Sequence, residues 1–245
     1  MTNRNEAAGT DRPLVFGGIE AVVTDVEGTT SAIAFVHDVL FPYARSALRD
    51  FIERRGAESD VRAILDAAKR EAGDVAMDDS SLVATLIRWI DEDRKATPLK
   101  ALQGVIWEEG YRRGVLTGHV YADAADALKR WAESGIRLYV YSSGSIAAQK
   151  LVFGHSPFGD LTPLFAGHFD TTTGPKREPE SYRRIVRAIG VSPAAVLFLS
   201  DSAEEIAAAK TAGFRTVQFI REGEAQPAPP GQASARSFAE IRVKR

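Results

Sequence analysis

Two carboxylates stand directly behind a short apolar run near the start of the chain. Residues 21–23 have the composition of a strand buried on both faces of a parallel sheet, and Asp25 and Glu27 follow. Gly28 breaks the strand pattern, so we expect both carboxylates at the carboxyl edge of the sheet, where ligands bind in open α/β proteins. Such a pair suits Mg²⁺, which takes one or two carboxylates together with phosphate oxygens of a substrate. The same residues could form a solvated acidic turn.

A second polar stretch follows the next predicted strand. Residues 136–141 read as a strand that runs into Ser142, Ser143 and Gly144, and then into a helix that continues through Gln149. Backbone N–H groups at a helix start, with hydroxyl groups beside them, make a site for an anion such as phosphate. An ordinary serine-rich turn with a helix cap is the alternative.

Two further stretches complete a set of charged groups. Lys176 lies in a loop before a helix predicted over residues 180–189, where it could supply the fixed positive charge that phosphoryl transfer requires or simply be solvated. Residues 195–199 read as a third buried strand. Asp201 follows this strand directly, and Glu205 lies one helical turn further on. A fourth strand is predicted over residues 216–220.

The helices that must position these groups fall into one block. Residues 35–55, 61–71 and 99–113 carry apolar residues at helical spacing, and Ser80 and Ser81 indicate the N-cap of another helix. No strand-like stretch occurs between Ser31 and about Gly118. We interpret this block as an all-helical module inserted behind the first strand. A helix over 123–134 then precedes the second strand.

The composition narrows the classes of function. The chain has 245 residues, 31 Lys and Arg against 33 Asp and Glu, and a net charge of −2, which gives no indication of a nucleic-acid surface. No apolar run approaches the roughly 20 residues of a membrane span. The chain lacks cysteine, which excludes disulfides and thiolate nucleophiles. Residues 1–13 are polar and lack a signal-peptide core, so we expect a disordered tail and a cytoplasmic protein.

The order of these motifs resembles that of the haloacid dehalogenase-like (HAD) phosphohydrolases over nearly the whole chain. The chain more closely resembles the enolase-phosphatase (acireductone synthase) family of methionine salvage. The stretches that carry this resemblance are 25–31 with 35–43, 139–145, 174–176 and 198–201. Glu27 stands where most of the superfamily has Asp. One departure is the segment 221–224, Arg-Glu-Gly-Glu, where the family usually has an Arg-Pro-Gly-Asn-like turn.

The resemblance implies a role for each site residue. Asp25 would be the nucleophile that forms an aspartyl phosphate, and Glu27 the general acid and then base. Asp25, the backbone carbonyl of Glu27, and Asp201 would hold Mg²⁺. Ser142, Ser143 and Lys176 would hold the phosphoryl oxygens, and Glu205 would orient water on the metal.

The resemblance also implies an α/β fold and a substrate. The expected architecture is a HAD-like Rossmannoid three-layer core with a parallel sheet, formed by residues 14–34 and 116–245, with the helical cap at 35–115. The expected substrate is 2,3-diketo-5-methylthiopentyl 1-phosphate, converted by a monomer that binds neither nucleic acid nor membrane. Two alternatives remain: a Mg²⁺-dependent HAD phosphatase for another small phosphorylated metabolite, and a non-enzymatic phospho-receiver.

Overall fold

The computed structural model describes residues 13–221 and 228–245. Within these limits the chain forms two compact units, the first from residues 13–30, 121–143, 163–221 and 228–245 and the second from residues 31–120 and 144–162. The predicted cap, 35–115, lies within the second unit. That unit also contains residues 31–34, 116–120 and 144–162, which the sequence-based division places in the catalytic core. The predicted tail, apart from Pro13, and residues 222–224 of the segment that departs from the family pattern lie outside the described residues.

The first unit is built on a six-stranded sheet in which every pair of neighbours is parallel, as the α/β prediction requires. The strand order is β4-β3-β2-β5-β6-β7. The bounds are β2 (Ala21–Thr24), β3 (Arg137–Tyr141), β4 (Phe165–Phe169), β5 (Val196–Ser200), β6 (Arg215–Phe219) and β7 (Ser234–Ala235). β2 lies between β3 and β5 and is buried at every position, which is why it reads as an unbroken apolar run.

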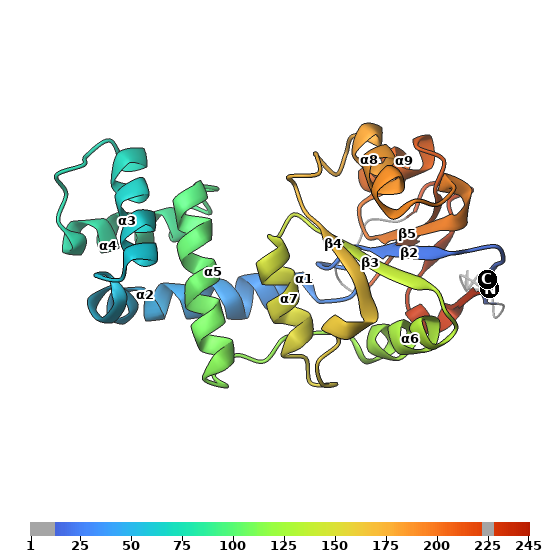
Figure 1. Ribbon diagram of the computed structural model, residues 1–245, viewed down its shortest axis with the longest axis horizontal. Coiled ribbons are helices and arrows are strands. Elements are labelled where there is room, and N and C mark those ends of the chain that lie inside the picture. The colour runs from blue at the N-terminus through green and yellow to red at the C-terminus, as the bar shows by residue number, and fades with distance from the viewer. Residues whose placement is uncertain (1–12, 222–227) are drawn as a thin grey trace, which may run out of the picture. The chain divides into compact units, whose positions relative to one another are not determined.

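Helices cover both faces of this sheet and give the three layers (Figure 1). α8 (Pro179–Ile189) and α9 (Ala203–Thr211) lie on one face, and α6 (Ala122–Glu133) lies on the other. Tyr182 and Ile185 of α8 and Ile206 of α9 belong to one buried apolar cluster with side chains of β2, β3 and β5. Trp131 of α6 packs against the buried Phe238, which docks the terminal segment on the first unit.

The second unit is helical throughout, and its own core holds it together. Its elements are α1 (Ile33–Phe35), the π-helical η1 (Val36–Leu40), α2 (Phe41–Arg55), α3 (Ser59–Ala72), α4 (Asp79–Asp91), α5 (Thr97–Arg112) and α7 (Ile146–Gly154). Leu48, Leu65 and Leu86, from three different helices, are fully buried in one cluster. Within the described part of the chain, every helix is too short or too polar to cross a bilayer.

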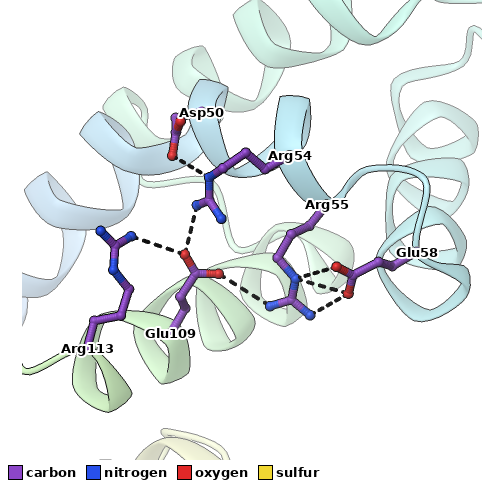
Figure 2. Close-up of polar contacts among 6 residues, drawn as sticks. All are labelled: Asp50, Arg54, Arg55, Glu58, Glu109 and Arg113. Atoms are coloured by element: carbon purple, nitrogen blue, oxygen red, sulfur yellow. Dashed lines mark hydrogen bonds and ion pairs between the residues drawn. The ribbon is translucent and has the colours of Figure 1, made fainter.

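A group of arginines around one buried carboxylate joins two helices of this unit (Figure 2). Arg54 Nη2 lies 2.7 Å from one oxygen of Glu109, and Arg113 Nη1 lies 3.3 Å from the same oxygen. Arg55 Nη1 approaches the other oxygen at 3.4 Å. Burial raises the pKa of Glu109, but the three guanidinium groups outweigh it and hold the pKa below its usual value. Glu109 therefore remains ionised and ties α5 to the end of α2.

Several details differ from the sequence predictions. Asp78 caps α4, because its side chain accepts a hydrogen bond from the backbone N–H of Ser81, so the assignment of the cap to Ser80 and Ser81 is wrong. β4 was not predicted, and neither was a separate two-stranded sheet of β1 (Leu14–Phe16) and β8 (Ile241–Val243). The helix predicted over residues 35–55 is divided near Pro42, which lies in the first turn of α2 behind the π-helical segment.

Candidate active site

The carboxyl ends of three neighbouring strands bring the predicted polar stretches together. Thr24, the last residue of β2, pairs with Val140 of β3 and with Leu199 of β5. The residues that follow each strand therefore leave the sheet at the same edge. The Asp25 N–H still donates to the Leu199 carbonyl at 2.9 Å, which fixes the backbone of Asp25 to β5.

A compact turn over residues 25–30 carries both Asp25 and Glu27. The Thr30 hydroxyl donates to the Asp25 carbonyl at 3.1 Å, and the N–H groups of Thr29 and Thr30 donate to the Val26 carbonyl. Gly28 has a φ of +72°, which a side chain opposes, and a Cβ placed on it would collide with the carboxylate of Asp201. Asp201 therefore packs directly against the turn that follows Asp25.

Lys176 lies between two carboxylates in the interior of the first unit. Its ammonium nitrogen is 2.5 Å from Asp25 Oδ1 and 2.7 Å from Glu205 Oε2, and its side chain is 6% exposed. Burial alone would lower the pKa of Lys176, but attraction to Asp25 and Glu205 raises it above its usual value. The lysine is therefore charged throughout the neutral range and is not a solvated loop residue.

Hydrogen bonds from β3 and α8 hold the loop that carries the lysine. Tyr182 of α8 donates its hydroxyl to the Lys176 carbonyl at 2.7 Å, and Ser181 donates to the Pro175 carbonyl at 2.8 Å. Tyr141 of β3 donates its hydroxyl to the Gly174 carbonyl at 2.9 Å. Residues 174–176 are thus fixed by side chains of two elements.

Glu205 holds the lysine from the first turn of α9. Its Oε2 accepts a hydrogen bond from the Ser200 hydroxyl at 2.8 Å in addition to the contact with Lys176. Burial and the charge of Asp25 raise the pKa of Glu205 to about 7, against the opposing effect of Lys176. The sequence suggested only a role in orienting water on a metal. The pairing with Lys176 was missed because residues 177–204 separate the two in the chain.

The remaining predicted residues lie at the same edge of the sheet. Ser142 and Ser143 follow β3 directly; Ser142 is buried and donates its N–H to the Phe169 carbonyl at 3.2 Å, whereas Ser143 is exposed. Glu27 and Asp201 are half-buried. The contacts above join Asp25 to Lys176 and place Asp201 against the turn, while the catalytic roles of these residues stay predictions.

The oxygen atoms at this edge suit a hard divalent cation. The carboxylates of Asp25 and Asp201, with a backbone carbonyl beside them, are the donors that Mg²⁺ prefers, and the packing of Asp201 on Gly28 brings its carboxylate to the turn. Among the residues that the structure describes, no group of three or more His, Cys, Asp or Glu side chains is arranged as a metal site. The expected Mg²⁺ ligands include only two such side chains, those of Asp25 and Asp201, so they would not form a group of three.

Comparison with known proteins identifies the family. The family of haloacid dehalogenase-like hydrolases matches residues 19–213. The protein named Enolase-phosphatase E1 from Pseudomonas fluorescens is 57% identical over 205 residues, which are 84% of this chain and 90% of that protein. The chain belongs to the enolase-phosphatase family. A protein of the same name from Methylococcus capsulatus is 54% identical and covers 85% of this chain, which in turn covers 92% of that protein.

Solved structures agree with the architecture of this enolase-phosphatase. The crystal structure of the UTR4 protein from Saccharomyces cerevisiae has a TM-score of 0.78 and 34% sequence identity, over 91% of this chain and all of that one. The structure of CbbY from Rhodobacter sphaeroides, determined in complex with phosphate, has a TM-score of 0.53 at 22% identity and shows the shared fold alone. The recognition of the family from its motifs, and the HAD-like α/β fold, are confirmed.

Proposed function

We propose that this protein converts 2,3-diketo-5-methylthiopentyl 1-phosphate, through its enol phosphate, to acireductone and inorganic phosphate in methionine salvage. The observation that carries the proposal is the buried ion pair between Asp25 and Lys176 at the end of the central strand. The pair joins the carboxylate that we propose as nucleophile to a fixed cation, in a chain whose relatives are named enolase-phosphatases.

In the phosphatase step, a carboxylate oxygen of Asp25 attacks phosphorus while the bond to the enol oxygen breaks. Glu27 gives a proton to the departing oxygen, which yields the acireductone and an aspartyl phosphate. Glu27 then takes a proton from water as the water oxygen attacks the phosphorus. The bond to Asp25 breaks, and the free carboxylate and inorganic phosphate are regenerated.

Lys176, Ser142 and Ser143 bind the phosphoryl group in this proposal. A buried ammonium is worth more there than in water, since little solvent screens the charge that develops on the phosphoryl oxygens. Mg²⁺ held by Asp25, the Glu27 carbonyl and Asp201 would offset the charge of the phosphate and polarise the substrate carbonyl during enolisation.

The deciding experiment supplies the diketo phosphate and Mg²⁺ to the purified protein and follows acireductone and phosphate together. We expect both products in equal amounts, and none after exhaustive chelation with activity restored by added Mg²⁺. Turnover of sugar phosphates in preference to the diketo phosphate would indicate another HAD phosphatase. Stoichiometric phosphorylation without turnover would indicate a receiver. The proposal includes a cytoplasmic monomer, which is a prediction from the sequence.

A further inference from the structure

A buried arginine at the end of β6 is committed to hydrogen bonds within the first unit. Nε and Nη2 of Arg221 donate to the Thr29 carbonyl at 3.1 and 2.9 Å. Nη1 donates to Asp123 Oδ2 at 2.9 Å and to the Arg236 carbonyl at 3.1 Å. These bonds use four of the five N–H groups of a guanidinium. Arg221 is therefore not a residue that binds the substrate.

The surroundings of Arg221 keep the guanidinium in place. It lies over the ring of Tyr121 at 4.1 Å and near the ring centres of Phe219 and Phe238 at 5.1 and 5.5 Å, distances at which a cation is attracted to an aromatic face. Asp123 is itself fixed by the Ser237 hydroxyl and the Phe238 N–H, both at 2.7 Å. A planar group held on its edges and its face has little freedom to move.

Arg221 holds the end of the turn over residues 25–30, which we call the catalytic turn. The Thr29 carbonyl, which accepts both arms of the guanidinium, belongs to the turn that begins at Asp25 and includes Glu27. The Thr29 hydroxyl is buried and has no hydrogen-bond partner among the described residues, so the backbone fixes this residue. The Tyr121 N–H holds the next carbonyl, that of Thr30, at 2.9 Å.

We propose that Arg221 is a positioning residue of the catalytic turn, which sets the location of Glu27 relative to Asp25 through the carbonyl of Thr29. This inference rests on the proposed phosphatase chemistry, in which Glu27 protonates the leaving oxygen. These contacts explain why arginine is required. Only a planar guanidinium group can donate twice to one carbonyl, donate to a carboxylate as well and stack on an aromatic ring.

The test compares Arg221→Lys with Arg215→Lys in hydrolysis of aryl phosphates. Arg215, the first residue of β6, is a matched control, because it also donates to a backbone carbonyl, that of Gly17 at 2.7 Å, and lies 5.0 Å from a ring, that of Phe16. Misplacement of a catalytic group by about 1 Å can cost about 10²-fold in rate. We expect kcat to fall about 10²-fold in Arg221→Lys with KM within a few-fold, and to stay unchanged in Arg215→Lys.

The leaving group separates a misplaced acid from a damaged fold. Phenyl phosphate needs protonation of its leaving oxygen far more than p-nitrophenyl phosphate does, and general acid catalysis contributes about 10²–10⁴-fold. We therefore expect Arg221→Lys to lose at least about tenfold more kcat/KM on phenyl phosphate than on p-nitrophenyl phosphate, because kcat/KM reports the step in which the leaving oxygen is protonated. A smaller folded fraction lowers both rates equally, so an equal loss on the two esters, or no loss, overturns the inference.

A second variant covers the case in which Arg221→Lys does not fold. Asp123→Asn leaves the arginine in place and removes its charged partner, and we expect a smaller loss with the same selectivity for phenyl phosphate. Equal loss on both esters in this variant also overturns the inference. If the wild-type protein hydrolyses aryl phosphates but not the diketo phosphate, the proposed substrate is wrong while the comparison of Arg221 variants stands.

Discussion

At the scale of single residues, the active site brings two carboxylates onto one lysine and a third carboxylate onto the adjoining turn. Asp25 and Glu205 share one lysine, and Asp201 packs on the adjoining turn. Buried carboxylates without enough positive charge repel each other and repel a phosphate. Burial, and then the charge of Asp25, raise the pKa of Glu205 to about 7. Two carboxylates on one ammonium, with a third on the adjoining turn, support the proposed Mg²⁺, and Lys176 is the fixed part of the positive charge.

Replacement of Lys176 by Met should therefore remove charge that matters most in the transition state. Loss of one such electrostatic contact costs about 10²–10³-fold in rate. We expect kcat for p-nitrophenyl phosphate to fall by that factor in Lys176→Met. Lys210→Met, which changes an exposed lysine on α9, is the control and should match the wild type. Activity of Lys176→Met within a few-fold of wild type would show that the lysine does not act on the phosphoryl group.

Gly28 allows a test of the packing between the turn and Asp201. Gly28→Ala adds backbone strain of about 1–2 kcal/mol and a methyl group that meets the Asp201 carboxylate. Gly190→Ala is a matched control, because its φ of +69° gives the same strain and its Cβ meets nothing within 4 Å. Both variants should melt at similarly lowered temperatures, and only Gly28→Ala should lose Mg²⁺-dependent hydrolysis. Full activity in Gly28→Ala would show that Asp201 can move without consequence.

At the scale of elements, burial decided which parts of the fold could be predicted. β2 and β5 are buried at every position, so each reads as a clear apolar run between turn signals. β4 was missed because Gly167 and His168 interrupt a half-buried edge strand. β1 and β8 are only three residues long. The helix cap at Asp78 was placed two residues late because neighbouring polar residues are equally suited to cap a helix.

The residues of the candidate site also fall into those that the sequence could predict and those that it could not. The strand ends at Asp25, Ser142 and Asp201 were predictable, because each follows a recognisable strand and parallel strands share one edge. The local sequence left the role of Lys176 open, because nothing local places a loop lysine in the interior, and only the resemblance to a family favoured a role at the site. The pairing of Glu205 with Lys176 and the hold of Arg221 on Thr29 join segments far apart in the chain, which no local pattern reports.

The arginine group around Glu109 gives a prediction for the helical unit. Glu109→Gln removes the charge that three guanidinium groups share, and hydrogen bonds to charged groups are worth about 1.5–3 kcal/mol. We expect a loss of stability near the lower figure, measured by urea unfolding at pH 7. Asp91→Asn breaks an exposed pair with Arg45 and serves as control, with an expected loss of stability much smaller than that of Glu109→Gln.

The dependence of this effect on pH has a definite sign. Because the folded protein lowers the pKa of Glu109, its contribution is present above the unfolded pKa of about 4.3 and is lost as the pH falls toward the folded pKa. The difference in stability between wild type and Glu109→Gln should therefore shrink as the pH falls below the unfolded pKa of about 4.3. A difference that grows on acidification would contradict the assignment of an ionised Glu109.

At the scale of the whole molecule, the protein is proposed to catalyse two reactions with one set of catalytic side chains. The first unit contains every residue assigned to phosphoryl transfer, and the helical segment 35–115 enters the chain directly behind the catalytic turn. Enolisation needs a polarised carbonyl and a base for the carbon-bound proton, whereas hydrolysis also needs a nucleophile on phosphorus. The two reactions should therefore be separable by removing the nucleophile alone.

Asp25→Asn is the variant that makes this separation. A neutral amide is a poor nucleophile, yet its oxygen can still coordinate Mg²⁺ weakly, so we expect the variant to enolise the diketo phosphate and then stop. The enol phosphate should accumulate as a conjugated enone chromophore with no phosphate released. Asp126→Asn, an exposed change on α6, should complete both reactions. If Asp25→Asn binds substrate and Mg²⁺ but leaves the diketone unchanged, the charge of Asp25 or its exact hold on the metal is required for enolisation as well. The two reactions would then share Asp25, and Glu27→Gln would become the variant in which to look for a separated first step.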